Sequence, residues 1–293
     1  MMDRSNQVFL FLSHSVSTRV VREYRNIRRA IAGMGNSIFL HHNRCNEATP
    51  GLTRHELYLF SDESLSRLNY PMWELSFFPG QVHFPLLQFF RDNPDFDYYW
   101  LIEYDVRFAG NWRLFFDYFR DKNQDFLTCH IRRHADEPGW RWWSLLHHPH
   151  KSIPLSERLG SFNPIYRLSN PSLSFLHQSL SDGWCGHCEV LLPTLLHHNG
   201  FTIMDIGGKG TFTPPSMEDN FYTAQRNSDG ALECGTMRCQ PSFWRVGQEK
   251  NKLYHPVKPL PFVVRERINS WKCERWLPGR LARRIWDAFL PRL

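Results

Sequence analysis

Short apolar segments of strand character alternate with segments of helical spacing over the first 130 residues of this 293-residue chain. This alternation restricts the fold more than any other feature. It favours an α/β architecture with a mostly parallel sheet and right-handed crossovers. From the apolar periodicity we predict strands at 8–12, 37–40, 56–60, 98–102 and 125–130, and helices at 20–32, 84–90 and 111–120, the last capped by Asn111.

The alternation breaks after residue 130. A segment rich in Trp, His and Pro at 134–160 is typical of irregular structure. No repeat or low-complexity linker divides the chain, so we expect one domain over 1–262, followed by a helical tail over 263–293. Within the domain, the later segments predict strands at 165–168 and 201–206 and helices at 171–180 and 189–198.

Composition narrows the class of protein. A hydrophobic fraction of 42% is ordinary for a globular chain, and a net charge of +6 suits an anionic partner. No apolar run reaches the ~18 residues of a membrane span, and the apolar run near the start is shorter than a signal-peptide core. We therefore expect a cytoplasmic protein with free thiols at its seven scattered cysteines. No clustered recognition motif indicates nucleic acid as a partner.

Polar residues follow the predicted strands. Ligands in parallel α/β sheets bind at the carboxyl ends of strands. Glu103 and Asp105 lie two residues apart at the end of the apolar "YYWLI", so extended chain points both to the same side. Paired carboxylates suit Mg²⁺ or Mn²⁺, which keep coordination positions open for phosphate oxygens. Other polar residues after strands are Ser13, His14, His41, His42 and Asp62.

The stretch "DGWCGHCE" contains the Cys-Gly-His-Cys string of thiol-disulfide oxidoreductases. Cys185 and Cys188 precede a predicted helix, whose dipole would lower a thiol pKa. A redox function is therefore one alternative, although the preceding segment predicts a helix and a turn where a thioredoxin fold needs a strand. A zinc site is a second alternative, formed by these two cysteines with His187, His197 or His198.

Three segments resemble the GT-A-fold glycosyltransferases. "WLIEYD" resembles the D-x-D signature, with Glu103 at the first position. "DGWCGHCE" is similar in outline to the G-W-G-G-E-D type segment of inverting members such as the galactosyltransferases, with His-Cys replacing part of its acidic pair. "KLYHPVKP" matches by order and chemistry the later histidine and lysine of such enzymes, at His255 and Lys258.

The resemblance implies a GT-A-like, Rossmann-type mixed sheet, mostly parallel and flanked by helices, with a C-terminal helical appendage. It implies a metal-dependent transfer of a sugar from a nucleotide sugar, of UDP type, to a hydroxyl of a glycan or lipid-linked glycan, with inversion. Such acceptors occur in bacterial surface-polysaccharide synthesis. The cation, Mn²⁺ or Mg²⁺, would be held by Asp105, Glu103 and His255.

The resemblance also assigns the other site residues. Lys258 would neutralise the diphosphate, and Glu103 would contact the ribose or the metal. Glu189 is the expected base that deprotonates the acceptor hydroxyl, with His187 as the competing candidate because its ordinary pKa of ~6.5 suits the role. The nucleoside would contact Ser13, His14 and Asp62, while the acceptor would meet Trp184 as a platform and Gly186 as open space.

The C-terminal tail combines basic and apolar residues at helical spacing. Over 271–292, six Lys and Arg side chains are interleaved with Trp, Leu, Ile and Phe. A helix of this composition predicts either contact with an anionic membrane at its inner face or docking against the protein's own core.

Overall fold

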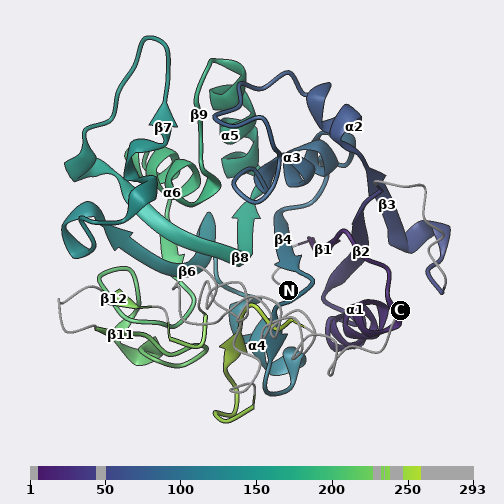
Figure 1. Ribbon diagram of the computed structural model, residues 1–293. Coiled ribbons are helices and arrows are strands. Elements are labelled where there is room, and N and C mark those ends of the chain that lie inside the picture. Colours follow the sequence, from purple (N-terminus) through teal and green to yellow (C-terminus); the bar gives the residue numbers. More distant parts are fainter. Residues whose placement is uncertain (1–5, 44–50, 227–231, 234, 238–246, 259–293) are drawn as a thin grey trace, which may run out of the picture.

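The computed structural model describes residues 6–43, 51–226, 232–233, 235–237 and 247–258 (Figure 1). A seven-stranded sheet in the order β10-β6-β8-β4-β1-β2-β3 forms its centre. All pairings are parallel except those of β8, which runs antiparallel between β4 and β6. The strands are β1 Gln7–Ser13, β2 Gly35–His42, β3 Leu57–Phe60, β4 Tyr98–Glu103, β6 Phe126–Arg133, β8 Leu159–Ser169 and β10 Ile203–Asp205.

Helices cover both faces of this sheet. The central strands are buried on both faces, so successive residues of β1 enter two different cores: Leu10 packs in one hydrophobic cluster and Phe11 in the other. The cluster with Phe11 is covered by α1 Thr18–Ala30 and α4 Trp112–Phe119. The cluster with Leu10 is covered by α2 Asp62–Ser66, α3 His83–Asp92, α5 Asn170–Ser181 and α6 Cys188–His198.

Short elements complete the described chain. Three two-stranded pairs are β5 Arg107–Phe108 with β13 Leu253–Tyr254, β7 Leu146–His147 with β9 Cys185–Gly186, and β11 Gln225–Arg226 with β12 Leu232–Glu233. Five 3₁₀ turns lie at Arg54–Glu56, His134–Asp136, Arg141–Ser144, Leu155–Glu157 and Pro215–Met217.

The structure confirms the predicted fold class as far as its architecture goes, a mixed, mostly parallel α/β sheet flanked by helices. It also confirms Asn111 as a helix cap, since its side chain accepts a hydrogen bond of 2.9 Å from the backbone N–H of Arg113. The predicted domain boundary at 262, the helical appendage and the basic tail lie outside the described residues. Within the described residues, no helix combines the length and apolar character that a membrane crossing requires.

Strand β8 is longer than the predicted 165–168 because it buries polar side chains that interrupt the apolar pattern. It has 11 residues, among them Ser161, Asn163 and Arg167, which are all buried. The two terminal nitrogens of the Arg167 guanidinium donate to the backbone carbonyls of Phe119, Lys122 and Gln124, which makes burial of this charged group possible.

Candidate metal centre and adjoining pocket

The turn that follows β4 is held against a segment from the end of the described chain. Strands β5 and β13 pair antiparallel, with Leu253 opposite Phe108. The backbone N–H of Val257 donates a hydrogen bond of 2.8 Å to the carbonyl of Asp105. These contacts place His255 over the carboxyl end of β4, where the two carboxylates lie.

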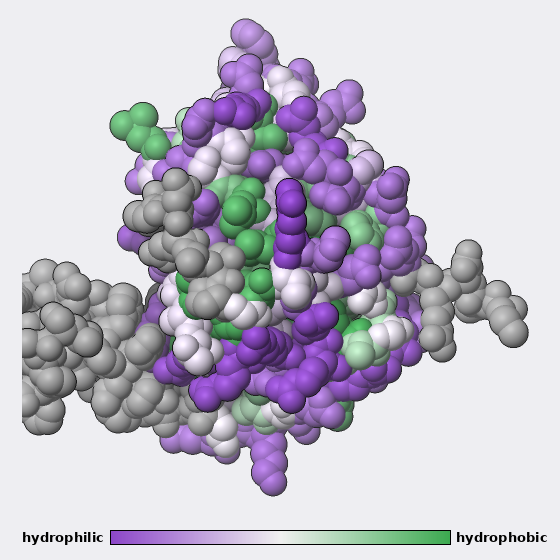
Figure 2. Space-filling view, turned by 90° about the vertical axis from the view of Figure 1, so that its right-hand side faces the viewer, coloured by the Kyte–Doolittle hydropathy of each residue, from purple (hydrophilic) through white to green (hydrophobic). Residues whose placement is uncertain are grey.

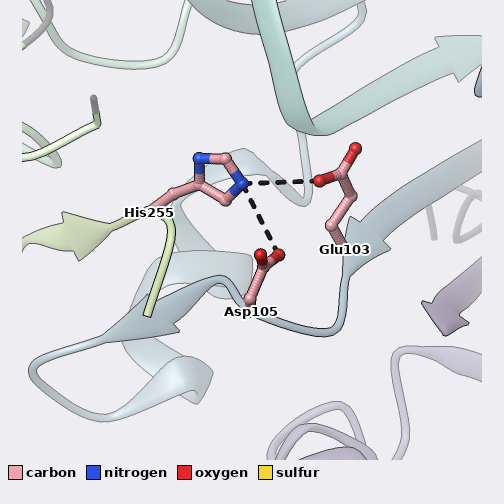
Figure 3. A group of neighbouring side chains, drawn as sticks. All are labelled: Glu103, Asp105 and His255. Atoms are coloured by element: carbon pink, nitrogen blue, oxygen red, sulfur yellow. Dashed lines mark ion pairs between the residues drawn. The ribbon is translucent and has the colours of Figure 1, made fainter. Parts of the chain in front are cut away.

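Glu103, Asp105 and His255 form a compact group (Figure 3). The Nε2 atom of His255 lies 3.4 Å from a carboxylate oxygen of Glu103 and 3.5 Å from Oδ1 of Asp105. One ligand atom from each residue lies within 4.8 Å of the other two. Among the described residues, no other set of three or more His, Cys, Asp or Glu side chains has this geometry. Two carboxylates and an imidazole are ligands typical of a divalent cation.

Buried charge dominates this group. Asp105 is 2% exposed, and its second oxygen forms an ion pair with Lys258. Burial alone would raise the pKa of Asp105, but His255 and Lys258 hold it well below its usual range. Burial opposes the charge on His255, yet Asp105 and Glu103 raise its pKa to about 9.

One oxygen in the group lacks a hydrogen bond. In the described part of the chain, Oδ1 of the buried Asp105 has no hydrogen-bond partner. This oxygen forms an ion pair with Nε2 of His255 at 3.5 Å but accepts no hydrogen bond from the described residues, so a metal ion could add a stronger contact there. The donor set and this oxygen together fit a divalent cation.

A pocket of about 330 Å³ adjoins the group through Glu103 and Tyr104. This volume lies in the range of ligand sites. The phenol of Tyr104 accepts a hydrogen bond of 2.8 Å from Lys258, which also pairs with Asp105, so Lys258 links a residue of the pocket wall to the metal-ligand group. The pocket is lined by Leu12, Ser13, His14, His42, Phe78, Pro79, Val82, Glu103 and Tyr104.

Two of the three residues expected at a nucleoside line this pocket. Ser13 ends β1 and His14 follows it, with the His14 ring packed edge-on against Tyr104 at 4.9 Å between centroids. Asp62 does not line the pocket. Its carboxylate lies 2.8 Å from Nε2 of His42, which does, so the contact of Asp62 with the pocket is indirect.

Glu189 lies in the first turn of α6. Polar side chains of β8 form hydrogen bonds to the backbone of this turn and so hold α6 against the sheet. Asn163 donates a hydrogen bond of 3.2 Å to the carbonyl of Cys188, and Ser161 donates one of 3.3 Å to the carbonyl of Glu189. The Glu189 side chain is 16% exposed. Burial raises its pKa to about 7; Arg132 opposes the rise and Glu103 adds to it. Because the charge of Glu103 affects the pKa of Glu189, Glu189 interacts electrostatically with the metal-ligand group.

His187 caps α6, and its Nδ1 lies 3.9 Å from a carboxylate oxygen of Glu189. Its Nδ1 accepts a hydrogen bond of 3.3 Å from the backbone N–H of Glu189. The ring stacks on Trp142 at 4.6 Å, and burial, aided by Arg141, lowers the pKa of His187 to about 4. The ring is therefore neutral near pH 7, with its acceptor nitrogen already engaged.

The structure does not bring Trp184 and Gly186 to the metal-ligand group. Trp184 is 8% exposed and lines a different pocket, of about 530 Å³, together with residues of α5 and the end of α6. A side chain at Gly186 would meet the Leu145 carbonyl at 2.1 Å. The glycine is therefore required by the close pairing of β7 with β9.

The two cysteines of the motif have the properties of structural thiols. Cys185 is half-buried in β9 and Cys188 is buried at the start of α6. Burial raises the pKa of both thiols, which is opposite to the low pKa of redox-active cysteines. The zinc alternative is wrong in its geometry: His197 and His198 lie at the other end of α6, roughly 14 Å from Cys188 at 1.5 Å per residue. In the described part of the chain, Cys185, Cys188 and His187 do not come close enough to share a metal ion either.

Sequence reasoning missed several residues around the group. Phe78, Pro79 and Val82 line the pocket from a segment without a distinctive pattern before α3. His42, the last residue of β2, also lines the pocket, where the sequence indicates only a polar residue at a strand end. Arg132, buried at the end of β6, affects the pKa of Glu189, and its side chain forms an ion pair with Glu137. An arginine at the end of a strand is too common a pattern to indicate an interaction with Glu189.

No family model and no curated protein matches the chain. Among solved structures, the chain is similar to a glycosyltransferase involved in the glycosylation of the major capsid of PBCV-1, with 10% identity and a TM-score of 0.30 over 59% of this chain and 66% of that one. It is also similar to glucosyl-3-phosphoglycerate synthase from Mycobacterium tuberculosis, with 12% identity and a TM-score of 0.40 over 72% and 73%. A third similar structure is the inositol-1-phosphate CTP transferase from T. maritima, with 8% identity and a TM-score of 0.40 over 71% and 88%.

Proposed function

We propose that the protein is a metal-dependent glycosyltransferase that moves a hexosyl group from a nucleotide sugar, of UDP type, to a hydroxyl of a glycan or lipid-linked glycan. The observation that carries the proposal is the convergence of Glu103, Asp105 and His255, one ligand atom of each lying within 4.8 Å of the others, around a buried Asp105 oxygen that accepts no hydrogen bond from any described residue. This convergence occurs beside a pocket at the carboxyl ends of β1, β2 and β4, the edge where α/β sheets bind ligands.

The donor would lie across the pocket and the metal-ligand group. Phe78, Pro79 and Val82 offer an apolar wall to a base, while Ser13 and His14 offer polar groups to the ribose or phosphate. Lys258 contacts both Tyr104 of the pocket wall and Asp105, so its ammonium could turn from the carboxylate to an incoming diphosphate.

The ligand set favours Mn²⁺ over Mg²⁺, because an imidazole nitrogen suits manganese better than the strongly oxygen-seeking magnesium ion. The ion would be held by Glu103, Asp105 and His255. When bound, it supplies stabilisation of the charge that develops on the departing diphosphate.

Glu189 is the proposed base of an inverting transfer. A carboxylate with a pKa of about 7 is half ionised at neutral pH, which suits proton abstraction from an acceptor hydroxyl. His187 is the weaker candidate, because its Nδ1 accepts a backbone hydrogen bond and its ring is stacked under Trp142. Trp184 and Gly186 stay proposals for the acceptor side without a contact to this group.

A thermal-shift screen of nucleotide sugars with and without Mn²⁺ tests the proposal. Ligands that bind the native state raise its apparent stability. A rise in melting temperature with one nucleotide class, seen only with Mn²⁺ and absent in Asp105→Asn, is the expected outcome. The absence of any Mn²⁺-dependent shift across the common nucleotides would refute it.

The cellular setting belongs to the proposal too. A cytoplasmic enzyme at the inner face of the membrane, with residues 271–292 as a peripheral contact, would suit a lipid-linked acceptor in bacterial surface-polysaccharide synthesis. The raised thiol pKa values of Cys185 and Cys188 give the oxidoreductase alternative no support.

A further inference from the structure

Helix α1 carries a row of arginines on its outward face. Val20, Val21, Tyr24 and Ile27 are buried against the sheet. The exposed residues of the opposite face include Arg19, Arg22, Arg25, Arg28 and Arg29. Figure 2, which looks onto the α1 side of the molecule, shows strongly hydrophilic side chains gathered across the lower half of this face. The row extends roughly 15 Å along the helix, at 1.5 Å per residue.

This row works against the stability of the helix that carries it. Arg19, Arg22, Arg25 and Arg29 follow one another at spacings of three or four residues, where like charges repel. Arg19 also lies in the first turn, where the helix dipole disfavours a cation and no acidic residue is present. Arg28 is neutralised by Glu56, whereas Glu23 faces Trp112 and Arg107. An anionic partner would relieve this repulsion.

The neighbouring helix α4 also exposes apolar side chains. Helices α1 and α4 pack against each other on one face of the sheet (Figure 1). Leu114 and Tyr118, one turn apart on α4, are 49% and 36% exposed. A shallow hollow between the two helices is flanked by Arg29 and Arg113. Arginines beside exposed apolar side chains suit a lipid bilayer, where charge attracts and apolar groups insert.

We propose that the α1/α4 face, defined by Arg19, Arg22, Arg25, Arg29, Leu114 and Tyr118, docks on an anionic phospholipid surface. The exposed Leu114 and Tyr118 favour a bilayer over nucleic acid, because a bilayer has an apolar interior into which they can insert and a phosphodiester backbone has none. Helix α1 begins directly after the Ser13 and His14 loop of the pocket, so the docked surface would adjoin the candidate site. The inference stands on the charge and exposure of this face, independently of the transferase proposal.

Co-sedimentation of the full chain with vesicles tests the docking surface. Binding to vesicles of phosphatidylcholine mixed with phosphatidylglycerol, and not to phosphatidylcholine alone, is the expected result. Arg22→Gln/Arg29→Gln should weaken this binding about thirty-fold, since each arginine contributes about 1 kcal/mol near an anionic surface. Leu114→Ser/Tyr118→Ser should also weaken it, while leaving its dependence on salt unchanged.

The matched control is Arg67→Gln/Arg91→Gln, which removes the same charge from exposed positions on the side of α2 and α3. It should bind as the wild type does. The Arg22→Gln/Arg29→Gln protein should melt at or above the wild-type temperature because repulsion is reduced, which separates lost docking from unfolding. Equal loss in the control, full binding by the α1 variant, or preference for duplex DNA over the anionic vesicles would each overturn the proposal.

Discussion

The Nε2 atom of His255 lies 3.5 Å from Oδ1 of Asp105, although the two residues belong to segments far apart in the chain. The contact depends on the pairing of β13 with β5, which holds the His255 segment against the turn after β4. Oδ1 has no hydrogen-bond partner among the described residues. The pair therefore presents a nitrogen and an oxygen that one cation could bind together.

The first prediction concerns Asp105→Asn. The Mn²⁺-induced rise in melting temperature should vanish, and the metal-free protein should lose about 3 kcal/mol of stability because Lys258 and His255 lose their buried partner. The pKa of Asp105 is held low, so its stabilising contribution is present at neutral pH and fades as the pH falls below 3.8, its ordinary value. The exposed Asp121→Asn serves as control, and a retained Mn²⁺ shift in Asp105→Asn would contradict the assignment.

The second prediction is that Mn²⁺ affinity rises with pH. The two carboxylates raise the pKa of His255 to about 9 in the metal-free protein, and only the neutral imidazole binds a metal. Up to about pH 9 each bound ion should therefore release close to one proton. The ion pairs themselves stabilise the metal-free fold fully below pH 6.5 and lose this effect as the pH rises through 9. Calorimetric titrations in buffers of different ionisation enthalpy measure the released proton, and affinity independent of pH would rule His255 out.

The third prediction is that Glu189→Gln separates stability from activity. Burial raises the pKa of Glu189 from 4.5 to about 7, so the fold favours the protonated carboxyl; that contribution is complete below pH 4.5 and is lost as the pH rises through 7. Replacing the ionised group should therefore stabilise the protein above pH 7, by up to about 3 kcal/mol. The rate of sugar transfer should fall by about 10²–10⁴-fold, the usual contribution of a general base. The surface variant Glu63→Gln should change neither property, and a fully active Glu189→Gln would remove this residue as the base.

The fourth prediction concerns the cysteines. Because burial raises both thiol pKa values, Cys185 and Cys188 should react slowly with a thiol reagent in the folded protein and readily after unfolding. Cys185→Ser/Cys188→Ser should keep the Mn²⁺-dependent binding of the donor. Fast labelling in the folded state, together with loss of activity in the double variant, would instead favour the oxidoreductase alternative.

The sequence predicts the sheet well because its strands are apolar on both faces. Continuous apolar runs mark β1 and β4, and the carboxylates after β4 lie at the expected edge. Ser13 and His14 reach the pocket for the same reason. The first half of β8 escaped this reasoning, since its buried Ser161 and Asn163 donate hydrogen bonds to backbone carbonyls of α6 that only the folded chain brings near.

The other site residues could not be placed from the sequence, because tertiary contacts decide where they lie. His255 reaches the carboxylates through a pairing of two-residue strands, which no periodicity can indicate, so only the family resemblance anticipated it. Trp184 shows the reverse case. A tryptophan before a glycine-rich turn suggests a sugar platform, but its ring is buried among core side chains and lines a separate pocket. Burial of an aromatic ring depends on neighbouring elements that the motif does not contain.

The most direct test of the account is pulsed electron paramagnetic resonance of Mn²⁺ added to the purified protein. Modulation of the spin echo by an imidazole nitrogen reports a histidine bound to the ion. We predict one bound Mn²⁺ whose echo carries nitrogen modulation in the wild type, loses it in His255→Gln, and is not bound tightly by Asp105→Asn. If no Mn²⁺ binds, or the nitrogen modulation persists in His255→Gln, the metal centre of Glu103, Asp105 and His255 is contradicted.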